Sequence, residues 1–220
     1  MPRYSVIIPS AGRRPLAWGQ AIDSALAAAH AAKLDDVEIL VGFDGVRGQR
    51  VRKDARIRWY DLPADHDFGN GPRQALLRAA RGRRVVFLDD DNALLPQAFS
   101  VYEAHDVDML VARIDVSRAF PLPFLPLAHA DKALIRPGNI DPLCLCLTRK
   151  LVVTRCGGWL PRAPYAPQRD GGQYESDYRN ILRYWRRAAS TLAVDDVVGV
   201  YDAGRGMDAE GMNARQKALR

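Results

Sequence analysis

The chain turns abruptly from apolar to acidic within the stretch Val85-Val86-Phe87-Leu88-Asp89-Asp90-Asp91-Asn92. A short run of apolar residues is typical of a strand that is covered on both faces, and the aspartates mark its end. Three adjacent carboxylates repel one another, so they are costly to hold beside a buried strand unless a cation shares them. Mg²⁺ or Mn²⁺ is commonly held by one or two carboxylates while substrate phosphates complete the coordination. The stretch therefore predicts a metal and diphosphate site, although a solvated acidic turn that caps the next helix explains it as well.

The rest of the chain alternates strand and helix patterns around this stretch. Helices are predicted at residues 15–32, 70–82, 96–105, 149–156 and 173–189. Strands are predicted at residues 4–8, 37–43, 56–62, 85–88, 108–114, 143–147 and 191–201. This order predicts an α/β fold with a mostly parallel central sheet and helices on both faces.

Polar residues follow several of the predicted strands. Ser10 and Asp44 come at the ends of the first two strands, and Asp89 to Asp91 follow the fourth. In an open parallel sheet, the ligand crevice lies outside the carboxyl ends of the strands. We therefore expect these side chains to gather at one edge of the sheet.

Composition is that of one soluble globular domain. The chain has 220 residues, of which 48% are apolar, and a formal net charge of +6. Its three cysteines, Cys144, Cys146 and Cys156, lack CxxC spacing and favour a reducing compartment. No stretch approaches the roughly 18 apolar residues of a membrane span. We therefore expect a cytoplasmic protein.

The basic residues are mostly arginine, since only five of the 32 are lysine. Arginine forks match phosphate oxygens two at a time, so an anionic partner such as a nucleotide diphosphate is one interpretation. A GC-rich coding sequence that spells basic residues as arginine is the other.

Several motifs occur in an order that resembles the family 2 glycosyltransferases, which have a GT-A fold and include inverting enzymes. The resemblance covers roughly residues 4 to 187. The motifs are Val6-Ile7-Ile8-Pro9-Ser10, Glu38-Ile39-Leu40-Val41-Gly42-Phe43-Asp44-Gly45, Gly71-Pro72-Arg73-Gln74-Ala75, Phe87-Leu88-Asp89-Asp90-Asp91-Asn92, and Gly157-Gly158-Trp159 followed by Tyr174-Glu175-Ser176-Asp177-Tyr178.

The resemblance implies a role for each matching position. Nucleotide-binding positions are matched by Pro9, Ser10, Asp44, Arg73, Asp89 and Asp90. Metal-binding positions for Mn²⁺ or Mg²⁺ are matched by Asp91 and Asp89. The general base of inverting members is matched by Asp177 or, failing it, Glu175, because Ser176 separates the two carboxylates.

The predicted helix at residues 173–189 supports a base independently of the family. Its apolar spacing places Tyr178, Ile181, Leu182 and Trp185 on the buried side. Asp177 then lies in the first turn, where the helix dipole favours negative charge and keeps the carboxylate able to accept a proton. An acidic first turn that merely stabilises the helix is the alternative.

Together these features predict a metal-dependent inverting glycosyltransferase. It would move a sugar from a nucleotide-diphosphate donor, most simply a UDP-sugar, to a hydroxyl of a glycan or lipid-linked acceptor. The expected domain spans residues 1–201, with a nucleotide-binding half at 1–115, an acceptor-binding half at 116–201 and a flexible tail at 202–220. Peripheral contact with the inner face of the membrane is compatible with this function, and no nucleic acid partner is expected.

Two other functions remain open at this point. Ile8-Pro9-Ser10-Ala11-Gly12-Arg13 resembles the opening of sugar-phosphate nucleotidyltransferases. A catalytically silent module that binds anions or nucleic acid on the same fold is the second alternative.

Overall fold

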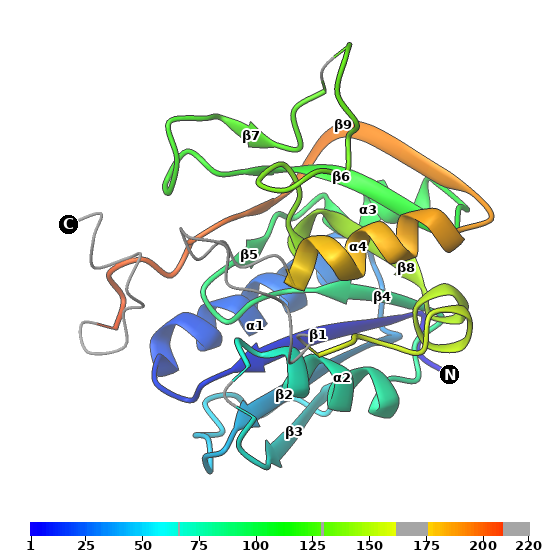
Figure 1. Cartoon of the computed structure of the whole chain (residues 1–220). Coiled ribbons are helices and arrows are strands. Elements are labelled where there is room, and N and C mark those ends of the chain that lie inside the picture. Colours follow the sequence, from blue (N-terminus) through cyan, green and yellow to red (C-terminus); the bar gives the residue numbers. More distant parts are fainter. Residues whose placement is uncertain (66, 129, 162–175, 209–220) are drawn as a thin grey trace.

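The computed structural model describes residues 1–65, 67–128, 130–161 and 176–208 (Figure 1). These residues form a sheet of nine strands: β1 (Tyr4–Ser10), β2 (Val37–Asp44), β3 (Ile57–Leu62), β4 (Arg84–Phe87), β5 (Ala93–Leu94), β6 (Met109–Asp115), β7 (Phe124–Leu125), β8 (Leu145–Thr148) and β9 (Thr191–Val200). The α-helices are α1 (Pro15–Ala31), α2 (Asn70–Ala79), α3 (Ala98–Glu103) and α4 (Ser176–Arg187). A 3₁₀ turn, η1 (Pro142–Cys144), and a π-helical turn, η2 (Lys150–Arg155), complete the described elements.

The strands are arranged in the order β3-β2-β1-β4-β8-β6-β9-β5, and β7 pairs with the far end of β6. Strands β1 to β4 are parallel to one another, and β9 is parallel to β6. Strand β8 lies between β4 and β6 and is antiparallel to both, so β6 points in the same direction as β4. The predicted α/β class with a mostly parallel sheet is therefore confirmed, and β8, β7 and β5 are its antiparallel members.

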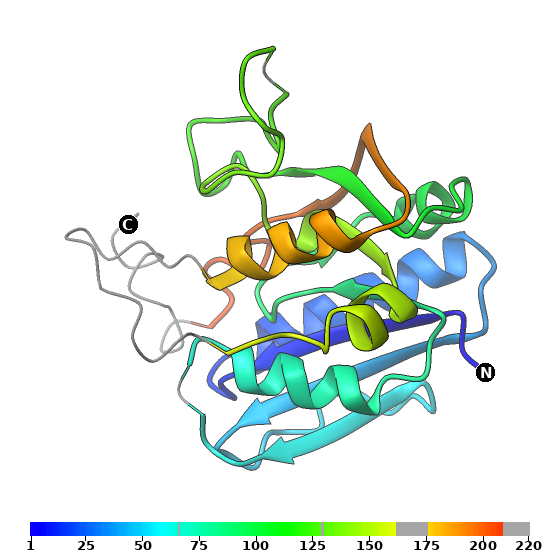
Figure 2. The same ribbon diagram turned by 45° about the vertical axis from the view of Figure 1, so that its right-hand side comes forward.

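Helices cover both faces of the sheet. Helices α1 and α3 pack together on one face, and α2, η2 and α4 lie on the other (Figures 1 and 2). Every residue of β1 is buried, and so is every residue of β4, because both strands are covered on two sides. Both expected halves of the chain contribute strands to this one sheet.

The segment after β9 packs against the end of β4. The amide of Asp202 donates to Asn92 Oδ1 at 2.8 Å, and the amide of Gly204 donates to the carbonyl of Asp91 at 2.9 Å. Asp208 accepts hydrogen bonds from the first amides of α1, at Leu16 and Ala17. Residues 202–208, the start of the expected tail, therefore have polar partners at the sheet edge. Residues 209–220 lie outside the described residues.

The buried side of α4 includes polar residues that were not predicted. Ile181 is buried as expected and Tyr178, Leu182 and Trp185 are partly buried against the core, but Asn180 and Tyr184 are fully buried as well. Asn180 Nδ2 donates to the carbonyl of Leu160 at 3.0 Å, and Tyr184 Oη donates to that of Gly158 at 2.9 Å. Polar side chains face inward here because the backbone of residues 158–160 needs partners, a demand that apolar periodicity does not record.

No helix in the described part of the chain is long and apolar enough to cross a membrane.

Candidate active site

The carboxyl ends of β1 and β4 meet at one edge of the sheet. Ser10 Oγ donates to Asp90 Oδ2 at 2.5 Å, and the amide of Gly12 donates to Ser10 Oγ at 3.0 Å. Both Ser10 and Asp90 are buried. The structure therefore brings these two predicted residues together, as the parallel pairing of β1 with β4 requires.

Asp90 is an unusual carboxyl group for its position. Burial raises its pKa to about 7, the guanidinium of Arg14 opposes that rise, and the charge of Asp91 adds to it. Burial also raises the pKa of Asp91. The carboxyl groups of Asp90 and Asp91 at the end of β4 therefore keep their negative charge only with the help of neighbouring cations.

Arg14 supplies one of those cations. Its Nη1 atom donates to Asp91 Oδ2 at 2.6 Å, and its Nη2 atom forms an ion pair with Asp90. The side chain of Arg14 is 16% exposed. None of the sequence motifs assigned to the site includes Arg14, although its place in the short loop between Ser10 and the first turn of α1 constrains it to lie near the strand end.

Arg73 supplies the second cation and links two distant parts of the sequence. Its Nη2 atom donates to Asp89 Oδ1 at 2.5 Å, and its Nη1 atom lies 3.9 Å from Asp177 Oδ1. The guanidinium is stacked 5.1 Å from the ring centre of Trp159, and its side chain is only 4% exposed. Gly69, which precedes α2, has φ 81°, a backbone conformation that glycine adopts without steric cost. Arg73 is thus a rigid bridge between the acidic stretch and α4.

Asp177 lies in the first turn of α4, as predicted, with its side chain 23% exposed. The end of the helix where it lies faces the carboxyl ends of β1 and β4 (Figure 2). Glu175, the alternative base, lies outside the described residues.

Asp141 is a further carboxyl group near this cluster, and the motif analysis missed it. Its Oδ1 atom accepts a hydrogen bond from the amide of Leu143 at 2.9 Å and so begins the turn η1. Burial raises the pKa of Asp141 to about 8, with the charge of Asp89 next in size and that of Asp177 also contributing. The Asp-Pro pair at residues 141 and 142 signals a helix start, but nothing local indicates that it faces the site.

Trp159 forms a wall behind Arg73. Its Nε1 atom donates to Asn70 Oδ1 at 2.6 Å, and its ring packs edge-on against Phe87 at 5.0 Å. Gly158 has φ 92° and passes so close to Gln74 that any side chain would collide with it. The Gly-Gly-Trp motif is therefore a buried support that fixes Arg73.

Pro9 and Asp44 lie at the same sheet edge. Pro9 pairs with Gly42 in the β1–β2 ladder, and its ring lies against the backbone at Gly69. Asp44 ends β2, and its Oδ1 atom accepts a hydrogen bond from the amide of Asp65 at 2.6 Å. The described contact of Asp44 therefore orders the loop after β3.

Carboxylate oxygens of the kind that Mg²⁺ and Mn²⁺ prefer are present at Asp89 and Asp91. Their side chains are 29% and 16% exposed, so both reach the surface of the site. Within the described ranges, no group of three or more His, Cys, Asp or Glu side chains is arranged to hold a metal ion. Both carboxylates accept hydrogen bonds from arginines, so an ion here would share them with Arg14 and Arg73 and would need ligand oxygens to complete its shell.

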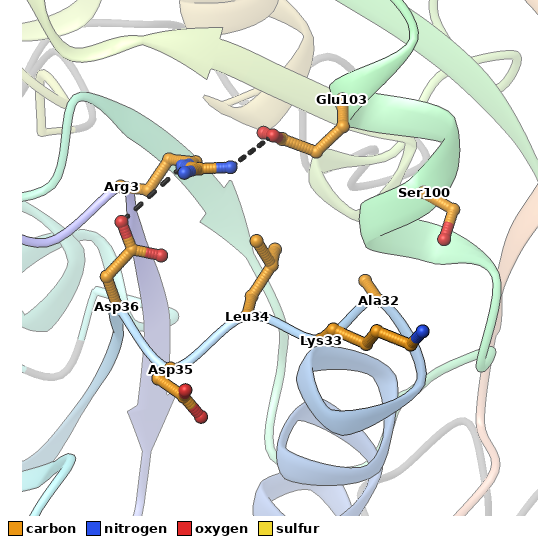
Figure 3. Close-up of a pocket in the computed structure, with 8 residues that line it drawn as sticks. All are labelled: Arg3, Ala32, Lys33, Leu34, Asp35, Asp36, Ser100 and Glu103. Carbon is orange, nitrogen blue, oxygen red and sulfur yellow. Dashed lines mark hydrogen bonds and ion pairs between the residues drawn. The ribbon is translucent and has the colours of Figure 1, made fainter.

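A cavity of about 610 Å³ lies near the opposite end of the sheet, beside the start of β1 (Figure 3). Arg3 pairs there with Glu103 and, at 3.4 Å, with Asp36 (Figure 3). Three of its charged lining residues thus form ion pairs with one another, and its lining carries charges of both signs, unlike the adjacent carboxylates of the carboxyl edge.

No family model matches the sequence, and no curated protein matches it either. Solved structures of S. aureus TarS do share its architecture. The fold resembles that of TarS. A crystal structure of TarS residues 1–349 superimposes with a TM-score of 0.68 at 16% identity, over 91% of this chain and 60% of TarS 1–349.

Two further TarS structures carry ligands. The complex with UDP-GlcNAc has a TM-score of 0.70 at 15% identity and covers 91% of this chain and 58% of that one. The complex with UDP has a TM-score of 0.66 at 16% identity and covers 91% and 60%. The chain thus spans about three-fifths of these structures, and the similarity confirms the predicted fold class.

Proposed function

We propose that the protein is an inverting glycosyltransferase that moves a sugar from a nucleotide-diphosphate donor to a hydroxyl group. The observation that carries this proposal is the bridge formed by Arg73, which contacts Asp89 and faces Asp177 across 3.9 Å. A carboxylate that can act as a base thereby lies beside the acidic strand end that suits a diphosphate and its counter-ion.

Two of the structures that share the fold hold UDP-GlcNAc and UDP, which favours a uridine nucleotide as the donor. Ser10 and Asp90 would contact the nucleoside side of the donor, together with Pro9 on β1 and Asp44 at the end of the neighbouring strand β2. Arg14 and Arg73 would face the diphosphate, where two guanidiniums offset its negative charge.

Mn²⁺ or Mg²⁺ held by Asp91 and Asp89 would supply further positive charge for the departing diphosphate. The chain's own contribution is to fix those two carboxylates in place. Asp89 is held by Arg73, and the carbonyl of Asp91 is held by the amide of Gly204. The segment after β9 therefore stabilises the strand end that binds the donor.

Asp177 would remove the proton from the acceptor hydroxyl. The acceptor oxygen then forms a bond to the anomeric carbon while the bond from that carbon to the diphosphate oxygen breaks on the opposite face. The proton stays on Asp177, and the electron pair leaves with the nucleotide diphosphate. The proposed acceptor is a glycan or a lipid-linked saccharide. The exposed Arg179 and Arg186 on α4 provide positive charge for peripheral contact with an acidic membrane.

Thermal unfolding with UDP, GDP, CDP and TDP, each with and without Mn²⁺, tests the donor. We expect UDP with Mn²⁺ to raise the melting temperature most, because a ligand stabilises the fold in proportion to its binding. UDP release from UDP-GlcNAc in the presence of saccharide acceptors, with the anomeric configuration of the product read by NMR, tests the reaction. Release of pyrophosphate from UTP and a sugar phosphate would instead show a nucleotidyltransferase, and a retained configuration would exclude Asp177 as the base of a single displacement.

A further inference from the structure

Arg14 occupies the place where a divalent ion would approach Asp91. Its guanidinium lies between Asp90 and Asp91 and donates to Asp91 Oδ2 at 2.6 Å. The three consecutive carboxylates of residues 89–91 therefore face two guanidiniums, those of Arg14 and Arg73. The chain's own cations therefore offset part of the negative charge of this stretch, and an excess of one carboxylate remains.

The two arginines differ in how exposed their side chains are. Arg73 is 4% exposed, lies against Trp159 and also donates to the carbonyl of Phe68 at 3.2 Å. Arg14 is 16% exposed and extends from the loop that leads from Ser10 to α1. Arg14 is therefore the guanidinium that an incoming ligand reaches first, and a ligand that binds it must replace its contacts with Asp90 and Asp91.

We propose that Arg14 and a divalent ion compete for Asp91, and that the displaced Arg14 binds the diphosphate of the donor. This inference rests on the proposed function, because it takes the donor to be a nucleotide diphosphate. An ion that arrives alone meets a cation already at its ligand, so it binds weakly. An ion that arrives with a diphosphate brings a new anionic partner for Arg14, so ion and nucleotide strengthen each other's binding, and the strengthening is equal in both directions.

A different role for Arg14 would leave another signature. If Arg14 served only to neutralise the buried Asp90, its loss would lower stability and would weaken ion and nucleotide binding together. Competition predicts instead that the two affinities move in opposite directions when Arg14 is removed.

The experiment measures Mn²⁺ affinity by electron paramagnetic resonance in the absence of nucleotide, and UDP affinity by calorimetry at saturating Mn²⁺. We expect Arg14→Gln to bind Mn²⁺ alone about tenfold more tightly than the unaltered protein, because one contacting positive charge has gone. We expect the same variant to bind UDP about tenfold more weakly, because the diphosphate has lost a charged donor.

Arg13→Gln is the matched control. Arg13 is the neighbouring residue, is exposed and forms no ion pair with any residue that the structure describes, so its replacement removes the same charge without the contact. Both affinities should stay within about twofold of their original values, since exposed charges act weakly through water. A Mn²⁺ gain in Arg13→Gln equal to that of Arg14→Gln would overturn competition at Asp91.

Arg14→Lys keeps the charge but reaches only one carboxylate, and it serves if Arg14→Gln does not fold. We expect it to bind Mn²⁺ alone about threefold more tightly than the original, because a lysine lacks the fork that holds both aspartates. Unchanged or weaker Mn²⁺ binding in both variants overturns the inference. If the unaltered protein still binds UDP in that case, the proposed function stands and only the inference fails. If the unaltered protein does not bind UDP, the proposed function is rejected, and the Mn²⁺ affinities of the variants can still be compared.

Discussion

Strand β1 carries a serine near each end, and each serine donates to a buried carboxyl group of a neighbouring segment. Ser5 Oγ donates to Glu38 Oε1 at 2.6 Å, and Ser10 Oγ donates to Asp90 Oδ2 at 2.5 Å. Glu38 is 5% exposed and Asp90 is 3% exposed. The pKa of Glu38 nevertheless lies below its usual value, while that of Asp90 is raised to about 7.

The difference lies in what surrounds each carboxyl group. Burial acts to raise the pKa of Glu38, but hydrogen bonds from Ser5, from the amide of Arg81 at 2.6 Å and from Arg58 at 2.9 Å outweigh it. Asp90 is buried next to two further aspartates, and Arg14 offsets only part of that charge. At the amino edge of the sheet, the negative charge of Glu38 is therefore balanced by its hydrogen-bond donors. The carboxyl edge retains an excess of negative charge that a cation can share.

We expect the largest effect on the rate of sugar transfer, and only from a substitution at the carboxyl edge. Asp177→Asn removes the proposed base, so we expect the rate of sugar transfer to fall by about 10²- to 10⁴-fold, the usual contribution of a general base. Glu38→Gln should change that rate by less than about threefold, since Glu38 lies at the other end of the sheet. The assay is UDP release from UDP-GlcNAc with acceptor present, and equal losses in the two variants would contradict the proposed division of roles.

We expect the amino edge of the sheet to matter for the unfolding free energy, although not for the rate of sugar transfer. Glu38→Gln replaces charged hydrogen bonds by neutral ones and gives Arg58 a weaker partner, so we expect the free energy of unfolding to fall by about 2–3 kcal/mol. Urea denaturation measures it. Asp23→Asn is the control, because its ion pair with Arg52 is 40% to 50% exposed and should cost less than about 1 kcal/mol. A similar loss in both variants would show that Glu38 is no more than a surface charge.

The pH dependence of this stability follows from the lowered pKa of Glu38. A carboxyl group whose pKa is lower in the folded state stabilises the fold above its unfolded value, which is 4.5 for this group. That stability is lost as the pH falls through the folded value. The unfolding free energies of the unaltered protein and Glu38→Gln should therefore differ at pH 7 and converge below pH 4.5. A constant difference across this range would mean that the effect of the substitution is steric.

The amino-acid sequence predicted the fold and the centre of the candidate site from local patterns. The positions of the longer strands and helices followed from apolar runs, whereas the two-residue strands β5 and β7 were not predicted. The meeting of Ser10 with Asp90 followed from parallel topology. The insertion of β8 between β4 and β6 did not follow, because strand pairing depends on contacts between distant residues. Asp141 was missed for the same reason, since it lies far from the acidic stretch in sequence, whereas Arg14 lies only four residues after Ser10 and its position was a local signal that the motifs did not use.

We expect the smallest effects from substitution of Ser5 and Ser10, and these two variants compare the two ends of β1 directly. Ser5 Oγ also accepts a hydrogen bond from the amide of Gly82 at 2.8 Å, and a Cβ atom on Gly82 would collide with Ser5. Water therefore has no room to replace this hydroxyl, so Ser5→Ala should lower the unfolding free energy by about 1–2 kcal/mol and leave UDP affinity unchanged. Ser10 bonds instead to the half-buried amide of Gly12 and to Asp90, which keeps its ion pair with Arg14. Ser10→Ala should thus cost less than about 1 kcal/mol in urea denaturation yet weaken UDP binding several-fold by calorimetry. Equal changes in unfolding free energy and in UDP affinity in the two alanine variants would show that the two ends of β1 are equivalent. That result would contradict the assignment of donor binding to the carboxyl edge.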